Sequence, residues 1–140
     1  MKADIKRVDV WIAGVKDRPG ALAKKLDALA EAGARLEFLL ARRRPEKPGQ
    51  GMVFAAPIRT GKQTAAAKKA GFKKTRTLFA LRLATADKAG LGAKLTKKVA
   101  EAGINIRGLS AVAVAKRAVF YFAFDSTADV NKAARYLKQI

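Results

Sequence analysis

The sequence of 140 residues contains neither cysteine nor histidine. Disulfides, thiol nucleophiles and thiolate metal ligands are therefore excluded, and so is imidazole as an acid, a base or a metal ligand. No stretch approaches the roughly 18 uninterrupted apolar residues of a membrane-spanning helix. Asp4, Lys6, Arg7 and Asp9 interrupt the first apolar stretch. We therefore expect no signal peptide, no membrane partner and a cytoplasmic location.

Sequence motifs that carry catalytic chemistry are missing as well. The chain has no Gly-x-Ser-x-Gly elbow, no P-loop and no Gly-x-Gly-x-x-Gly phosphate loop. No spacing of acidic residues forces two carboxylates together. We therefore expect a binding protein that is not an enzyme and that has no cofactor and no metal ion.

Positive charge is abundant, with 30 lysines and arginines against 11 acidic residues and a net charge of +19. The excess is spread over both halves of the chain, and the densest cluster is the short stretch 41–47. A nucleic-acid-binding arm usually concentrates its charge. A generally basic surface is the favoured interpretation, and binding to an acidic protein or a nucleic acid is the alternative.

A short phrase occurs twice, as DRPGALAKKL at 17–26 and DKAGLGAKLT at 87–96. The offset of 70 residues also relates Gly33 to Gly103, and each is the last residue of a tetrapeptide Ala-Glu-Ala-Gly. Because 70 is half of the length, the chain is predicted to be one unit duplicated. We expect a first unit over residues 1–72 and a second over residues 73–140.

Apolar periodicity predicts the same elements in both units. The first unit is expected to hold strands at 8–15, 35–43 and 51–58 and helices at 21–33 and 61–71. The second is expected to hold a strand at 77–84, a helix at 90–103, a hairpin of 104–115 with 118–125, and a last helix capped by Ser126 or Thr127. This order predicts an α+β fold of two ferredoxin-like units, each with an antiparallel sheet and its helices on one face.

The combination of strand, Asp-Arg-Pro-Gly loop, helix ending in Ala-Glu-Ala-Gly and strand opening Ile-Asn-Ile at 104–106 resembles the ACT domain. The whole chain is similar to a stand-alone tandem ACT protein. The resemblance implies a βαββαβ plan and a regulatory protein that binds an amino acid or similar small carboxylate, commonly as a homodimer. Residues 72–76 leave little room for a fourth strand, and the sequence reaches Ile140 directly after the last helix. The final edge strand is therefore missing, shared, or supplied by the neighbouring unit.

The two repeated loops are the candidate ligand sites. A loop that feeds a helix N-terminus presents unpaired backbone N–H groups, and these favour an anion such as an amino acid carboxylate. The resemblance also implies that the residue at the start of the next strand contributes to the site. The candidate residues are Asp17, Arg18, Pro19, Gly20, Ala21 and Arg35 in the first unit, and Asp87, Lys88, Ala89, Gly90, Leu91 and Asn105 in the second.

Each candidate also has a purely structural interpretation. The two aspartates can cap the loops instead of meeting an ammonium group, and the two glycines can serve the turn alone. Arg35 can be an ordinary solvated side chain, and Asn105 can hydrogen-bond its own loop. Since Ala89 replaces Pro19, the first loop is the better candidate.

Three phenylalanines, Phe120, Phe122 and Phe124, fall on one face of a predicted strand. Aromatic residues on an open basic sheet stack RNA bases in some ferredoxin-like domains. An alternating apolar face is more often the one that helices cover, and the RNA-binding consensus of such domains is not met. We favour a core position for the three rings and keep nucleic-acid binding through the sheet as the alternative function.

Overall fold

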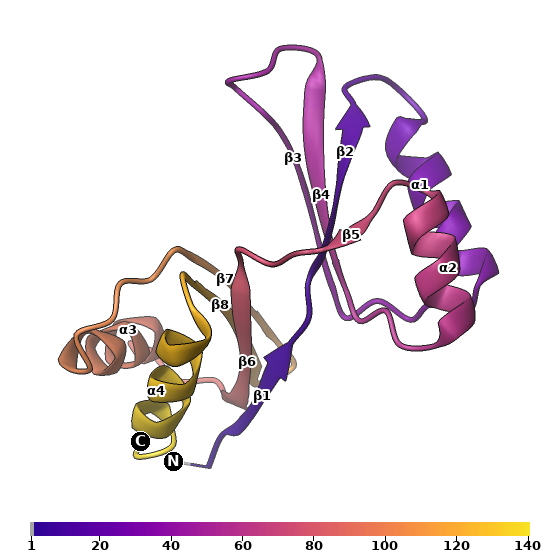
Figure 1. The fold of residues 1–140 in the computed structure, drawn as a ribbon. Coiled ribbons are helices and arrows are strands. Elements are labelled where there is room, and N and C mark those ends of the chain that lie inside the picture. The colour runs from indigo at the N-terminus through magenta and orange to yellow at the C-terminus, as the bar shows by residue number, and fades with distance from the viewer. Residues whose placement is uncertain (1) are drawn as a thin grey trace. The chain divides into compact units, whose positions relative to one another are not determined.

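Residues 2–140, the part of the chain that the computed structural model describes, form two antiparallel sheets of four strands each (Figure 1). The chain divides into two units. One is Asp9–Thr75, and the other joins Arg76–Ile140 to the N-terminal strand β1 (Asp4–Val8). In each unit the helices lie on one face of the sheet (Figure 1). The expected α+β fold of two ferredoxin-like units is confirmed.

The Asp9–Thr75 unit follows the order β-α-β-β-α-β. Its elements are β2 (Trp11–Lys16), α1 (Ala21–Glu31), β3 (Phe38–Arg43), β4 (Gln50–Ala56), α2 (Gly61–Lys69) and β5 (Lys73–Lys74). The strands are arranged β3-β4-β2-β5, and neighbouring strands are antiparallel. Trp11 lies opposite Ala55, which lies opposite Leu39.

The other unit has the same arrangement with a different starting point along the chain. Its elements after β1 are β6 (Phe79–Ala86), α3 (Leu91–Glu101), β7 (Gly108–Val114), β8 (Arg117–Phe124) and α4 (Thr127–Leu137). The strands are arranged β1-β6-β8-β7. Leu81 lies opposite Phe122, which lies opposite Leu109. These three positions match Trp11, Ala55 and Leu39, so the two sheets share one register.

The two sheets obtain their fourth strands from different parts of the chain. In the Asp9–Thr75 unit the two-residue strand β5 follows α2 and pairs with Trp11 and Ile12 of β2. In the other unit β1 pairs with β6, from Asp4 opposite Ala84 to Val8 opposite Ala80. The edge strand that the sequence left unassigned is therefore supplied by the N-terminal segment. The units differ accordingly from the expected ranges of 1–72 and 73–140.

Local hydrogen bonds explain where α2 and α4 begin. Thr60 and Gln63 form a capping box at α2, in which the Thr60 hydroxyl accepts from the Gln63 amide and the Gln63 side chain accepts in return. Ser126 caps α4 and accepts from the Asp129 amide. Gly71, with a φ of 94°, follows α2 as the expected C-terminal glycine. The predicted strand at 35–43 begins only at Phe38, and the one at 8–15 is divided between β1 and β2.

The three phenylalanines of β8 lie in the core of their unit. Phe122 and Phe124 are fully buried, Phe120 is 6% exposed, and the rings stack at centroid distances of 6.0 and 6.1 Å. They belong to one apolar cluster with residues such as Leu95 of α3 and Leu137 of α4. The prediction of a core position is confirmed, and these rings are not available to stack on RNA bases.

Candidate functional site

The first predicted loop forms a tight corner between β2 and α1. The Asp17 amide donates to the Gly49 carbonyl at 3.0 Å, which ties the loop to the turn between β3 and β4. Gly20 is the residue that caps α1, with a φ of 84° in the left-handed region. It provides no side-chain hydrogen bond to the helix. The first turn of α1 is therefore left without a side-chain cap.

The second loop has the same backbone geometry. The Asp87 amide donates to the Lys116 carbonyl at 2.9 Å, and Gly90 caps α3 with a φ of 78°. The Leu91 amide donates to the Lys88 carbonyl at 3.3 Å, as the Ala21 amide does to Arg18 at the same distance. Replacing Pro19 by Ala89 therefore leaves the corner unchanged.

Both helix starts are electropositive. Neither α1 nor α3 has an acidic residue in its first turn, and neither has a side-chain cap. The partial positive charge of the first-turn N–H groups is therefore not offset locally. Both loops therefore have a partial positive charge at the helix start, which is the property that the predicted anion site requires.

The two aspartates differ in their surroundings. Nε of Arg43 lies 2.8 Å from Oδ2 of Asp17 and donates a hydrogen bond to it. In the other sheet the register places Ala113 at the position of Arg43, because both lie four residues beyond the matched Leu39 and Leu109. Asp17 thus has a structural partner that the sequence did not indicate.

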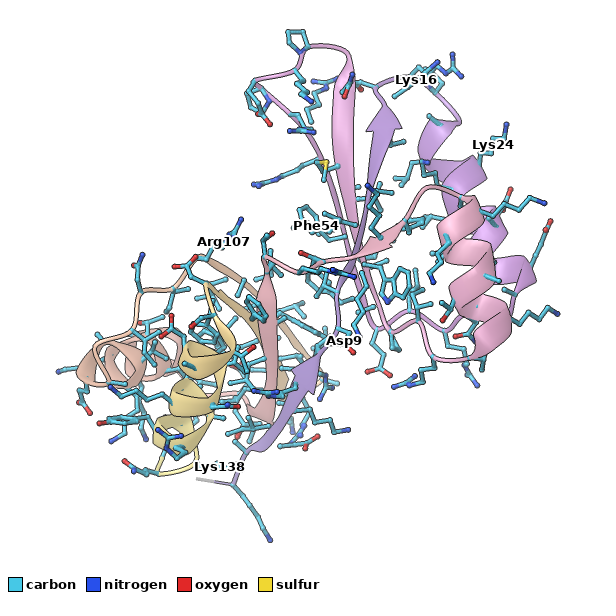
Figure 2. All side chains as sticks on the ribbon, in the orientation of Figure 1. Asp9, Lys16, Lys24, Phe54, Arg107 and Lys138 are labelled. Atoms are coloured by element: carbon cyan, nitrogen blue, oxygen red, sulfur yellow. The ribbon has the colours of Figure 1, made fainter. Side chains whose placement is uncertain are left out.

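A cavity of about 890 Å³ opens beside the first loop in the Asp9–Thr75 unit. Arg18 and Ala21 from the predicted site line it. Lys16 at the end of β2 and Lys24 on α1 also line it, and Figure 2 shows these two lysines on neighbouring elements. The cavity places three cations near the uncapped start of α1, a combination that favours a ligand with a carboxylate.

The predicted loop residues do not contribute equally to this cavity. Asp17, Pro19 and Gly20 lie in the corner itself, and of the described loop residues Arg18 and Ala21 are the ones that line the hollow. In the second loop Leu91 is 4% exposed and packs into the apolar cluster, where Ala21 is half-buried. The larger side chain at that position fills space that is open in the first unit.

Arg35 and Asn105 lie at the other end of their helices. Arg35 follows α1 and Asn105 follows α3, and both are exposed. A helix of 11 residues is about 16 Å long at 1.5 Å per residue. Neither residue is therefore close to the loop at the start of its own helix, and neither forms a site with that loop inside one unit.

Sequence reasoning missed the second wall of the cavity. Lys62, Ala66, Lys69 and Ala70 of α2 and its C-terminal end line the side opposite α1. Their spacing places them on one side of a helix, but alanine and lysine are common on any exposed helix face. The sequence signal that could have identified this wall is the difference between α2 and the last helix, which carries larger side chains at the positions of Ala66 and Ala70.

Further chemistry in the described residues is limited. Across residues 2–140, no three acidic, histidine or cysteine side chains gather as metal ligands would. A helix long and apolar enough to cross a membrane is likewise missing from this range.

The Arg44 guanidinium hydrogen-bonds the exposed Glu46 carboxylate and lowers the pKa of that carboxyl group. Both residues lie in the turn between β3 and β4, whose Gly49 carbonyl accepts from the Asp17 amide.

Comparison with known proteins gives structural similarity only. No protein-family model matches the sequence, and no curated protein matches it significantly. Protein BT0572 from Bacteroides thetaiotaomicron has a TM-score of 0.78 and 16% identity, over 96% of this chain and 89% of that one. The ligand-free regulatory subunit of aspartate kinase from Thermus thermophilus has a TM-score of 0.67 and 17% identity, over 99% and 96%. The regulatory subunit from Thermus flavus has a TM-score of 0.59 and 19% identity, over 99% and 94%.

At these identities the similarities establish the fold. The chain has a two-unit, ferredoxin-like fold, which it shares with these two regulatory subunits of aspartate kinase. A fold does not carry a function with it, so the function must be argued from the site.

Proposed function

We propose that this protein is a regulatory protein without catalytic activity that binds a small carboxylate, in the first place an amino acid, at the 17–21 loop. The observation that carries the proposal is the cavity beside the loop, into which Arg18 and Ala21 face at the uncapped start of α1. Helix-terminal amides and nearby cations are the groups that an α-carboxylate requires. The regulatory subunits that share the fold support the regulatory part of the proposal.

The charges around the loop suggest how an amino acid would lie. Its carboxylate would meet the first-turn amides of α1 and the side chain of Arg18. Its ammonium group would lie toward Asp17, whose carboxylate already accepts one hydrogen bond from Arg43. A carboxylate can accept several hydrogen bonds, so an ammonium group can share Asp17 with Arg43. Gly20 has open space where a Cβ would stand, which leaves room for the ligand.

The second loop is proposed as the weaker site. It has the same backbone corner at Asp87, Lys88, Ala89 and Gly90. Its aspartate lacks the arginine partner, and the buried Leu91 replaces the small Ala21. We therefore expect one tight site per chain.

We further propose that the protein is a cytoplasmic homodimer. The outer strands β3 and β7 carry exposed apolar side chains, including Leu39, Leu40, Val112 and Val114. Unpaired strand edges of this kind favour pairing with another chain. In such a dimer Arg35 or Asn105 of one copy could reach a loop of the other copy. Light scattering at micromolar concentration tests this, and a monomeric mass would contradict it.

The direct test is a thermal-shift screen of the purified protein against the twenty amino acids, followed by calorimetry. A ligand at 100 times its Kd should add about 2.7 kcal/mol to the free energy of unfolding. The proposal expects at least one amino acid to raise the melting temperature and to bind one site per chain. Failure of all twenty amino acids, and of simple dicarboxylates, to bind would contradict it.

Nucleic-acid binding is the second candidate function, because the net charge is +19. It would have to use cations alone, since the phenylalanine stripe is buried. Binding that neutralises several phosphates weakens steeply as salt is added. Capture of a single zwitterion should respond little, so titration at two salt concentrations separates the two functions.

A further inference from the structure

The cavity at the 17–21 loop continues as a groove between α1 and α2. The α1–α2 groove is defined by Lys24, Ala28, Ala32, Lys62, Ala66, Lys69 and Ala70. Figure 1 shows the two helices side by side on the same face of their sheet. Alanine is the only apolar residue type on both walls of this stretch, so another backbone can approach the two helices closely.

The groove is strongly positive. Lys24, Lys25, Lys62 and Lys69 line this stretch, against the single carboxylate of Glu31 among the described lining residues, and Lys16 and Arg18 line its loop end. Lys62 and Lys69 are exposed on the α2 side, and Lys24 is exposed on the α1 side. Cations therefore stand along both walls, with alanines between them.

Lys25 lies deeper than the other lysines. It is half-buried, and its Nζ donates a hydrogen bond to the carbonyl oxygen of Ala70 at 2.5 Å. Ala70 is the C-terminal cap of α2, where the helix dipole is negative. This contact fixes one positive charge inside the groove instead of leaving it to move in solvent.

The other unit shows that the groove is not a property of the fold. Leu91 and Leu95 stand where the first unit has Ala21 and Lys25, and both are buried. The capping residues Thr60 and Ser126 align the second helices, so Tyr136 of α4 corresponds to Ala70. In the Arg76–Ile140 unit, larger side chains thus occupy the space that is open in the Asp9–Thr75 unit.

We propose that the α1–α2 groove docks an acidic helical segment of a partner protein. The walls fit a helix that carries small residues on one stripe, with carboxylates on both sides of it to meet the lysines. Along α2 and its C-terminal end the groove extends from Lys62 to Ala70, about 13 Å of helix at 1.5 Å per residue. No aromatic ring is present among the described lining residues, so a nucleobase would find nothing to stack on. The surface is additional to the effector site at the loop.

The test uses the full-length protein and a fluorescent helical peptide of about 15 residues, with alanines on one stripe and glutamates beside it. A scrambled peptide of the same composition is the first control. We expect the striped peptide to bind at low salt and the scrambled one to bind at least about tenfold more weakly, because only the former presents matched charges to both walls.

Matched substitutions on the same helices locate the binding. Ala28→Leu with Ala66→Leu should weaken the peptide about tenfold by filling the groove, whereas Ala30→Leu with Ala65→Leu, at exposed positions outside it, should not. Lys69→Gln should weaken binding of the striped peptide, and the adjacent Lys68→Gln should not. Folding of every variant is checked by circular dichroism and thermal unfolding.

Three results would overturn the proposal. One is equal binding of the two peptides, another is equal loss in the groove variants and their controls, and the third is a short RNA duplex that competes for the same lysines more tightly than the peptide. Amino acid binding is measured by calorimetry on the same variants. Since Ala66 and Lys69 do not belong to the loop, an intact effector response with lost peptide binding, or the reverse, separates this proposal from the proposed function.

Discussion

Oδ2 of Asp17 accepts a hydrogen bond from Nε of Arg43 at 2.8 Å, across the corner that leads from β2 into α1. The pair is open to solvent, with the Arg43 side chain 82% exposed. Exposed pairs contribute only about 0–1 kcal/mol to the free energy of unfolding. Asp17→Asn should therefore change the melting temperature little and still remove the charge that a ligand ammonium group would meet.

The expected effect of Asp17→Asn on an amino acid ligand is a loss of affinity of about tenfold, because hydrogen bonds to charged groups contribute about 1.5–3 kcal/mol. Calorimetry at neutral pH measures it. Asp27→Asn on the exposed side of α1 is the control, and equal affinity in both variants would restrict Asp17 to its structural role.

Gly20→Val should block the ligand at the first loop. A Cβ at Gly20 would meet no atom within 4 Å, so the substitution projects into space that a ligand would use. The left-handed φ of 84° adds strain of about 1–2 kcal/mol. Gly33→Val is the matched control, because Gly33 has a φ of 79° and equally open surroundings at the other end of α1. Both should lose similar stability and only Gly20→Val should lose binding; equal ligand affinity in the two variants would place the ligand elsewhere.

Ile5→Ala tests the assignment of β1. Ile5 is half-buried and packs against the apolar cluster of the Arg76–Ile140 unit. The substitution should lower the free energy of unfolding by about 2 kcal/mol. Hydrogen exchange should accelerate in β6 and not in β2. Lys6→Ala, the next residue on the opposite face, should have little effect. Faster exchange in β2 alone would contradict the pairing of β1 with β6.

Phe122→Ala tests the role of the aromatic stripe. Phe122 is fully buried, so its truncation should cost about 3–5 kcal/mol. The conservative Phe122→Leu should keep the fold and leave any RNA binding unchanged. Thermal unfolding and filter binding measure the two effects. If the Phe122→Leu variant stays folded and binds RNA more weakly, the ring takes part in the alternative function, nucleic-acid binding.

The repeat and the periodicity of apolar residues were sufficient to predict the ferredoxin-like fold and the position of both loops. Matching Gly20 with Gly90 predicted two corners, and both residues adopt the same left-handed conformation. Short-range patterns determine such features, because helix caps and turns depend on residues close in sequence. Whether the loop residues bind a ligand stays a prediction.

Long-range pairing was not predictable from the same patterns. The strand Asp4–Val8 has three charged residues among five, and such composition is typical of edge strands and of loops alike. Its pairing with β6, in which Ile5 lies opposite Leu83, identifies it as a strand. The contact of Lys25 with Ala70 also joins residues far apart in sequence, so the helix pattern alone could not indicate it.

The origin of β1 determines the order in which the protein can fold during synthesis. Asp9–Thr75 is contiguous and can be completed as soon as Thr75 leaves the ribosome. β1 is synthesised before this unit but must wait for β6, whose first residue, Phe79, follows Val8 after 70 others. At about 5–20 residues per second this delay is roughly 4–14 seconds. During that time β1 has no partner strand, and its charged residues Asp4, Lys6 and Arg7 disfavour pairing with a neighbouring nascent chain.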